Sequence, residues 1–196
     1  MTRLLIVNNA EPDIRKFANA LIEIVKTANV DTECINYADC PTTDLKVFDG
    51  IILSGSPQGD EIVEHHAPFF RWIIDYKKPV LGICAGHHVT GHLYGSELLR
   101  NREPESGDFE ISIIKPDPIF NDLPNTMTVK QMHNDSITLP HDFELLATSS
   151  TCKNQMMKHK DKPLYTCQFH PEYYNHELIQ NFVMICCDRS HKKTTR

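Results

Sequence analysis

The chain has 196 residues, of which 40% are hydrophobic and 23% charged, and its formal net charge at pH 7 is −6. This size and composition are typical of a globular domain and exclude a disordered or fibrous protein. The sequence lacks the basic surface that nucleic-acid binding needs, and no apolar run is long enough to span a membrane. We therefore expect no nucleic-acid or membrane partner, one domain over residues 1–190, and a disordered basic tail over residues 191–196.

Seven cysteines are spread along the chain, and no Cys-x-x-Cys pair occurs. The first residues, Met1-Thr2-Arg3, enter a strand pattern without a signal peptide. A chain of this length does not need disulfides to fold, so we expect free thiols in a reducing cytoplasm.

Strand and helix patterns alternate through the first half of the chain. The predicted strands are Arg3–Asn8, Thr32–Asn36, Asp49–Ser54 and Pro79–Cys84. The predicted helices cover about residues 12–28, 61–76 and 86–94. This order predicts an α/β fold with a Rossmann-like, mostly parallel sheet flanked by helices. Active sites of such sheets lie beyond the carboxyl ends of the strands, where Cys84 and the Ser54–Pro57 turn stand.

The second half of the chain changes to antiparallel patterns. Five segments have the alternation of antiparallel strands: Phe109–Ile114, Thr126–Gln131, Phe143–Thr148, Cys152–Met157 and Leu164–Phe169. A final helix is predicted over His176–Cys187.

The segment Gly82-Ile83-Cys84-Ala85-Gly86 has the form Gly-x-nucleophile-x-Gly between a buried strand and a helix. A sharp strand-to-helix turn crowds its own backbone, so small residues must flank the nucleophile. The turn exposes the thiol at the edge of the sheet, and the helix N-terminus favours the thiolate. The alternative is a tight turn with an inert buried cysteine.

A second motif, Gln168-Phe169-His170-Pro171-Glu172, supplies a base and a carboxylate. The fixed φ of Pro171 stiffens the turn between His170 and Glu172. A carboxylate held in this way can accept from one imidazole nitrogen and leave the other to face a thiol. By itself this motif is equally consistent with a surface turn.

Together with Ser54-Gly55-Ser56-Pro57, these motifs resemble the three signatures of class I glutamine amidotransferases, in order and spacing. The resemblance implies Cys84 as nucleophile, His170 as base and acid, and Glu172 as the orienting carboxylate. It also implies an oxyanion hole from the backbone N–H groups of Ser56 and Ala85. The implied reaction hydrolyses glutamine through a γ-glutamyl thioester, without a cofactor.

Two positions depart from the family pattern. His88 stands where the family has a glutamine that helps to hold the substrate, and Ser56 replaces the second glycine of a Ser-Gly-Gly-Pro turn. We assign Gly55, His88 and His133 to substrate binding, and we expect the departures to affect substrate choice. His88 and His92 are also spaced as metal ligands on a helix, but no acidic or cysteine ligand accompanies them, so we predict no metal.

The segment Met132–Ile137 is similar to a His-x-Asp segment of the glutaminase part of GMP synthetases. This similarity implies a role of Asp135 in coupling to a partner and a place in purine biosynthesis. Because the sequence has no GxxxxGK[ST] loop, we expect the acceptor chemistry on a separate ATP-pyrophosphatase synthetase subunit. The alternatives are a stand-alone hydrolase of a γ-glutamyl compound, favoured by His88, and a non-catalytic relative of the fold.

Overall fold

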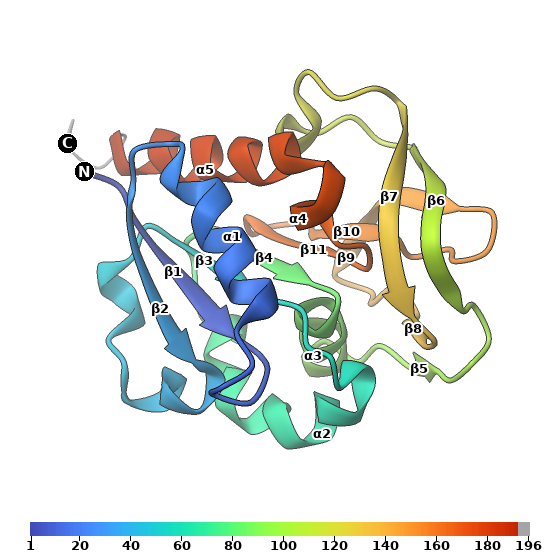
Figure 1. Cartoon of the computed structure of the whole chain (residues 1–196), viewed down its shortest axis with the longest axis horizontal. Coiled ribbons are helices and arrows are strands. Elements are labelled where there is room, and N and C mark those ends of the chain that lie inside the picture. Colours follow the sequence, from blue (N-terminus) through green and yellow to red (C-terminus); the bar gives the residue numbers. More distant parts are fainter. Residues whose placement is uncertain (192–196) are drawn as a thin grey trace.

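In the computed structural model, the backbone is described for residues 1–191, and the side chains for residues 1–58 and 61–188. Within this range a nine-stranded sheet forms the centre of the molecule (Figure 1). Its order is β2 (Asp31–Asn36), β1 (Arg3–Asn8), β3 (Gly50–Leu53), β4 (Val80–Ile83), β11 (Leu164–Cys167), β10 (Met156–His159), β9 (Phe143–Ser149), β6 (Glu105–Ile113) and β7 (Thr126–His133). A second, two-stranded sheet pairs β5 (Leu98–Leu99) with β8 (Ser136–Ile137).

The helices connect these strands. The α-helices are α1 (Lys16–Lys26), α2 (Val63–His66), α3 (Ala85–Leu93), α4 (Pro171–Tyr174) and α5 (His176–His191). The 3-10 helices are η1 (Tyr37–Thr42), η2 (Leu45–Val47), η3 (Gly59–Ile62), η4 (Ala67–Ile74) and η5 (Pro118–Phe120). Of the predicted tail, His191 is the last residue of α5, and residues 192–196 lie outside the described residues.

The predicted α/β class is confirmed: β2, β1, β3, β4 and β11 are parallel neighbours, and β10, β9, β6 and β7 follow in antiparallel pairs. The prediction that the strand at Leu164–Phe169 is antiparallel was wrong with respect to β4. This strand, β11, runs parallel to β4 and antiparallel to β10. All four of its residues are buried, as expected for a strand in the middle of a sheet covered on both faces.

Most predicted elements differ from the observed ones by one to four residues at an end, and two of the differences have a cause that the structure shows. The continuous helix predicted over residues 61–76 is divided into η3, α2 and η4. Pro68 in the first turn of η4 lacks an N–H, so α2 cannot continue through it with the full set of helical hydrogen bonds. The strand predicted at Cys152–Met157 begins only at Met156 as β10. The Ser149 hydroxyl accepts from the N–H groups of Thr151 and Cys152 and turns the chain before the strand.

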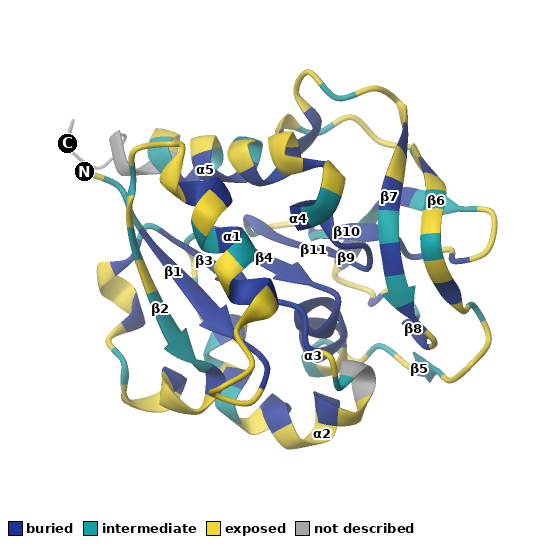
Figure 2. Ribbon diagram, in the orientation of Figure 1, coloured by how far each residue is buried: buried dark blue, intermediate teal, exposed yellow. Residues whose placement is uncertain are grey.

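Two apolar cores lie on the two faces of the sheet. Figure 2 shows that the strands in the middle of the sheet, β1, β4 and β11, are largely buried. On one face α1 and α5 pack side by side, with Leu21 of α1 and Phe182 of α5 fully buried against the strands. On the other face α3 and η4 cover the parallel strands, and Phe70 of η4 is fully buried there. Among the described helices, none has the length and apolar character needed to cross a membrane.

The parallel arrangement brings three loops to one edge of the sheet. Gly55 and Ser56 follow β3, Cys84 follows β4, and His170 lies three residues beyond β11. The Cys84 N–H donates to the carbonyl of Cys167 over 2.8 Å, which joins the ends of β4 and β11. The sheet therefore places the segments of all three sequence motifs next to one another.

Candidate active site

Cys84 occupies a strained turn between β4 and α3. Its φ is 48° and its ψ −98°, a conformation that non-glycine residues rarely adopt and that is common at functional sites. The predicted crowding is present: a Cβ on Gly82 would lie 2.7 Å from the carbonyl oxygen of Gly86, and a Cβ on Gly86 would lie 2.9 Å from that of Leu53. The glycines on both sides of Cys84 thus allow the turn to form.

His170 and Glu172 form a buried pair beside Cys84. The imidazole Nδ1 of His170 lies 2.7 Å from Oε1 of Glu172, and both side chains are 1% exposed. Burial disfavours the charged ring, but the thiolate of Cys84, which also hydrogen-bonds to the ring, and the Glu172 carboxylate raise the pKa of His170 to about 10. These contacts favour the imidazolium form of His170 beside the sulfur of Cys84.

The surroundings of His170 fix the orientation of its ring. Phe17 of α1 stacks on the imidazole with ring centroids 4.9 Å apart. Gly55 packs directly against the ring: a Cβ at this position would lie 2.6 Å from Cε1 of His170. The backbone N–H of His170 donates to the carbonyl of Lys130 over 2.9 Å. Gly55 therefore makes room for the imidazole, and its predicted role in substrate binding stays a prediction.

A pocket with a volume of about 540 Å³ opens onto this site. Its lining includes Phe17, Ser56, Cys84, His88, Ser106, His133 and His170. The structure thus brings together Cys84, His170 and three further residues predicted for the site: Ser56, His88 and His133. A volume of several hundred cubic ångströms is typical of a small-molecule site.

Ser56 and Ala85, predicted to supply the oxyanion hole, lie at the ends of β3 and β4. Ala85 is the first residue of α3, so its N–H belongs to the helix N-terminus, where N–H groups have no partner within the helix. Ser56 is absent from the described non-glycine residues with positive φ, so replacing the family's glycine causes no backbone strain in this conformation. Its hydroxyl donates to Oε1 of Gln58 over 3.0 Å. The role of its backbone N–H in the oxyanion hole stays a prediction.

His88 lies one turn into α3 and is 1% exposed. Its Nε2 is 2.7 Å from Oε1 of Gln168, and its Nδ1 is buried without a hydrogen-bond partner among the described residues. The side-chain nitrogen of Gln168 in turn lies 3.9 Å from the sulfur of Cys84. Gln168 was part of the histidine motif, but no separate role was predicted for it.

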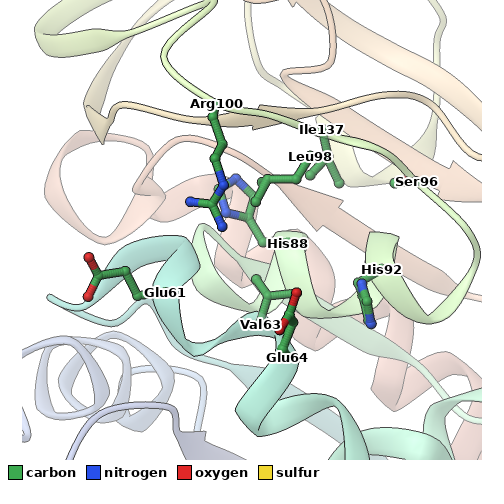
Figure 3. A pocket seen from close by; sticks show the side chains of 9 residues that line it. All are labelled: Glu61, Val63, Glu64, His88, His92, Ser96, Leu98, Arg100 and Ile137. Carbon is green, nitrogen blue, oxygen red and sulfur yellow. The ribbon is translucent and has the colours of Figure 1, made fainter.

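His88 also lines a second pocket (Figure 3). Its volume is about 160 Å³, and α3 contributes His88 and His92 to its wall. Glu61 and Glu64 bring carboxylates from η3 and α2, and Arg100 brings a guanidinium. His88 and Glu61 also line the larger pocket, so the two pockets share part of their walls.

His133 belongs to a buried polar network between β6 and β7. Its Nε2 lies 3.2 Å from Oε2 of Glu105, and its Nδ1 lies 2.9 Å from the carbonyl oxygen of Asp135. Glu105 also accepts from the Ser149 hydroxyl and from the Gln155 amide, each over 2.5 Å. This network holds the imidazole at the pocket wall, and no role was predicted from the sequence for its centre, Glu105.

Glu105, His133 and Cys152 are close enough together to be considered as metal ligands, with their ligand atoms within 4.8 Å of one another. Burial is the main cause that raises the pKa of the Cys152 thiol, and the neighbouring carboxylates of Glu103 and Glu105 add to it. Both ring nitrogens of His133 already face acceptors, and both carboxylate oxygens of Glu105 already accept hydrogen bonds. The cluster is therefore best described as a hydrogen-bonded network.

Asp135, predicted to couple the site to a partner, is buried in the loop after β7. Its Oδ1 accepts from the N–H of Asn101 over 2.7 Å, and its Oδ2 lies 3.4 Å from Arg100. These contacts tie the loop after β5 to the β7–β8 turn. They give Asp135 a structural role that is compatible with the predicted one, which stays a prediction.

The fold and the site define the class of protein: an α/β enzyme fold with a cysteine, a histidine and a glutamate at the carboxyl ends of neighbouring parallel strands. Residues 12–186 match the family model of class-I glutamine amidotransferases. The chain belongs to this family.

Individual relatives extend the comparison. The glutamine-hydrolyzing GMP synthase subunit of Thermoplasma acidophilum is 36% identical over 169 residues, which cover 83% of this chain and 84% of that protein. The protein of the same name from Thermoplasma volcanium is 35% identical over 176 residues, covering 87% and 86%. The crystal structure of a GMP synthase subunit from Thermoplasma acidophilum superposes with a TM-score of 0.86 at 30% identity, covering 99% of this chain and 98% of that one.

Proposed function

We propose that this chain hydrolyses glutamine to glutamate and ammonia and supplies the ammonia to a synthetase subunit of the GMP synthase type. The observation that carries the proposal is the buried row of Cys84, His170 and Glu172 in a chain of this family. The named relatives, which are glutamine-hydrolyzing subunits of GMP synthases, support the choice of acceptor.

The geometry suggests how the residues divide the chemistry. The Cys84 thiolate attacks the side-chain carbonyl carbon of glutamine, and the oxyanion forms within reach of the N–H groups of Ser56 and Ala85. When the C–N bond breaks, the His170 imidazolium gives its proton to the leaving nitrogen, so ammonia leaves and a γ-glutamyl thioester remains. His170 then removes a proton from water, which attacks the thioester and releases glutamate and the Cys84 thiolate.

Glu172 keeps His170 suited to both steps. Its carboxylate accepts from Nδ1–H over 2.7 Å, which leaves Nε2 to face the sulfur and the leaving group. The same carboxylate stabilises the imidazolium that exists before the first proton transfer.

The acceptor chemistry is assigned to a second protein. The sequence contains no GxxxxGK[ST] phosphate-binding loop, so we propose that the partner that consumes the ammonia is an ATP-pyrophosphatase synthetase subunit. The pathway would then be purine biosynthesis.

A second candidate function is a stand-alone hydrolase of a γ-glutamyl compound. The observation that favours it is His88, which lines the substrate pocket where the family has glutamine. An imidazole cannot offer the donor and acceptor pair of an amide, so the preferred γ-glutamyl group would differ.

Ammonia release from glutamine tests the proposal directly. We expect Cys84→Ala to abolish release and the matched control Cys34→Ala, a half-buried thiol on β2, to retain it. Addition of the synthetase subunit from the same organism should increase the rate for glutamine. A preference for a larger γ-glutamyl amide that the synthetase does not change would favour the stand-alone hydrolase, and full activity of Cys84→Ala would refute both functions.

A further inference from the structure

A chain of contacts runs from the interior of α3 to the nucleophile. Nε2 of His88 lies 2.7 Å from Oε1 of Gln168, and Nε2 of Gln168 lies 3.9 Å from Sγ of Cys84, a long distance that suits a hydrogen bond to sulfur. Gln168 and His88 are both almost completely buried. The backbone N–H of Gln168 donates to the carbonyl of Gln155 over 2.8 Å, so the main chain that carries this amide is fixed.

The protonation state of His88 determines the direction of these bonds. Burial lowers the pKa of His88 to about 4, with a further small decrease from His133, and the Gln168 hydrogen bond and Asp135 only partly oppose it. The ring is therefore neutral near pH 7 and carries one hydrogen. A neutral imidazole donates from one nitrogen and accepts at the other, and here the buried Nδ1 has no hydrogen-bond partner among the described residues.

We propose that His88 is a positioning residue for the nucleophile: its Nε2–H holds the oxygen of the Gln168 amide, so that the amide NH₂ group faces the sulfur of Cys84. The inference rests on the proposed function in so far as Cys84 is the nucleophile. It assigns roles to Gln168 and to His88, and His88 is one of the two positions at which this chain departs from the family pattern.

The reverse orientation of the amide is unfavourable next to a thiolate. In that orientation Gln168 would donate to His88, and the amide oxygen would face Sγ of Cys84. An amide oxygen carries partial negative charge and repels a thiolate, whereas an N–H donor stabilises it, and hydrogen bonds to charged groups are the stronger kind. The His88 donor therefore selects the orientation that favours the reactive form of Cys84.

The location of His88 explains how its side chain can act on the thiol of Cys84 through Gln168. His88 and Cys84 are four residues apart, on the same face of the first turn of α3, and the His88 N–H donates to the Cys84 carbonyl over 3.0 Å. Gln168 at the end of β11 spans the two side chains. The donor thus comes from the helix, and the amide comes from the strand that leads to His170.

The rate at which iodoacetamide alkylates Cys84 at pH 7 measures the effect, because the thiolate is the reacting form. His88→Leu removes the donor, and Gln168→Met removes the amide while keeping a side chain of similar length. We expect each to slow alkylation about tenfold, with a matching decrease in kcat for glutamine. The double variant should be no slower than the single ones, because both break the same chain of contacts.

Two further variants separate positioning from general damage to the fold. His88→Gln keeps an N–H donor for Gln168 and should restore the alkylation rate. His92→Gln, on the exposed side of the same helix, should leave the rate unchanged. Thermal unfolding of each variant shows whether it is folded, and if His88→Leu is not, Gln168→Met carries the test.

Wild-type alkylation by a folded His88→Leu or Gln168→Met variant would overturn the proposal, as would a His88→Gln variant as slow as His88→Leu. The alkylation assay needs no glutamine and no synthetase. Slow alkylation in these variants would therefore support the role of His88 even if the purified chain released no ammonia, and the proposed function would fail separately.

Discussion

The charge of Glu172 can be tested apart from its shape. The substitution Glu172→Gln keeps an oxygen that accepts from Nδ1–H of His170, now 2.7 Å from Oε1, but removes the negative charge. Glu172→Ala removes both the acceptor and the charge. Because both partners are 1% exposed, water cannot screen or replace their contact.

The expected magnitudes follow from the strength of buried hydrogen bonds. Replacing a charged acceptor with a neutral one should cost about 1–2 kcal/mol in the transition state, or about 5- to 30-fold in kcat/KM. Losing the acceptor as well should cost about 3 kcal/mol, or about 150-fold. The imidazolium that Glu172 helps to stabilise is needed when ammonia leaves, so the decrease should appear mainly in kcat.

Steady-state ammonia release from glutamine measures both variants, with thermal unfolding to confirm that each is folded. Glu177→Gln is the matched control, because this exposed carboxylate lies in the first turn of α5, away from the imidazole. If Glu172→Gln and the control had the same kcat/KM, the carboxylate would not act on His170 and the assignment of the three residues would be wrong.

Three other outcomes can be measured. Burial opposes the charged form of His170, but Cys84 and Glu172 raise its pKa from 6.5 to about 10. The contribution of His170 to the free energy of unfolding should therefore be complete below about pH 6.5 and decline as the pH rises to about 10. Chemical denaturation at several pH values measures this, and a flat profile over that window would contradict it. Gly86→Ala should lower the free energy of unfolding by about 1–3 kcal/mol, because the new Cβ would lie 2.8 Å from Cβ of Leu53; an unchanged melting temperature would refute the crowding. Asp135→Ala should destabilise the chain by about 1–3 kcal/mol by leaving the Asn101 N–H unpaired, whereas unchanged stability together with a lost response to a synthetase subunit would assign Asp135 to coupling alone.

The sequence predicted the parallel half of the fold well because strand, turn and helix signals are local there. The strand predicted at Arg3–Asn8 agrees with β1 at both ends, and the turn at Cys84 lies between β4 and α3 as expected. The prediction of one helix over residues 61–76 was wrong. The apolar periodicity continues through Pro68, whereas the α-helical backbone ends before it. The pairing of β11 with β4 also could not be predicted, since strand order depends on contacts between distant segments.

The candidate site shows the same division. The amino-acid sequence alone determined which residue types are available for chemistry: a thiol flanked by glycines, and an imidazole and a carboxylate separated by a proline. It did so because steric limits on a sharp turn and the fixed φ of proline act between near neighbours in the chain. Only the tertiary structure decided that Gln168 spans His88 and Cys84, that Glu105 holds His133, and that Gly55 makes room for His170. These contacts join residues 28 to 115 positions apart, and they exist because the sheet order and the packing of both faces bring the loop ends together, which no local pattern encodes.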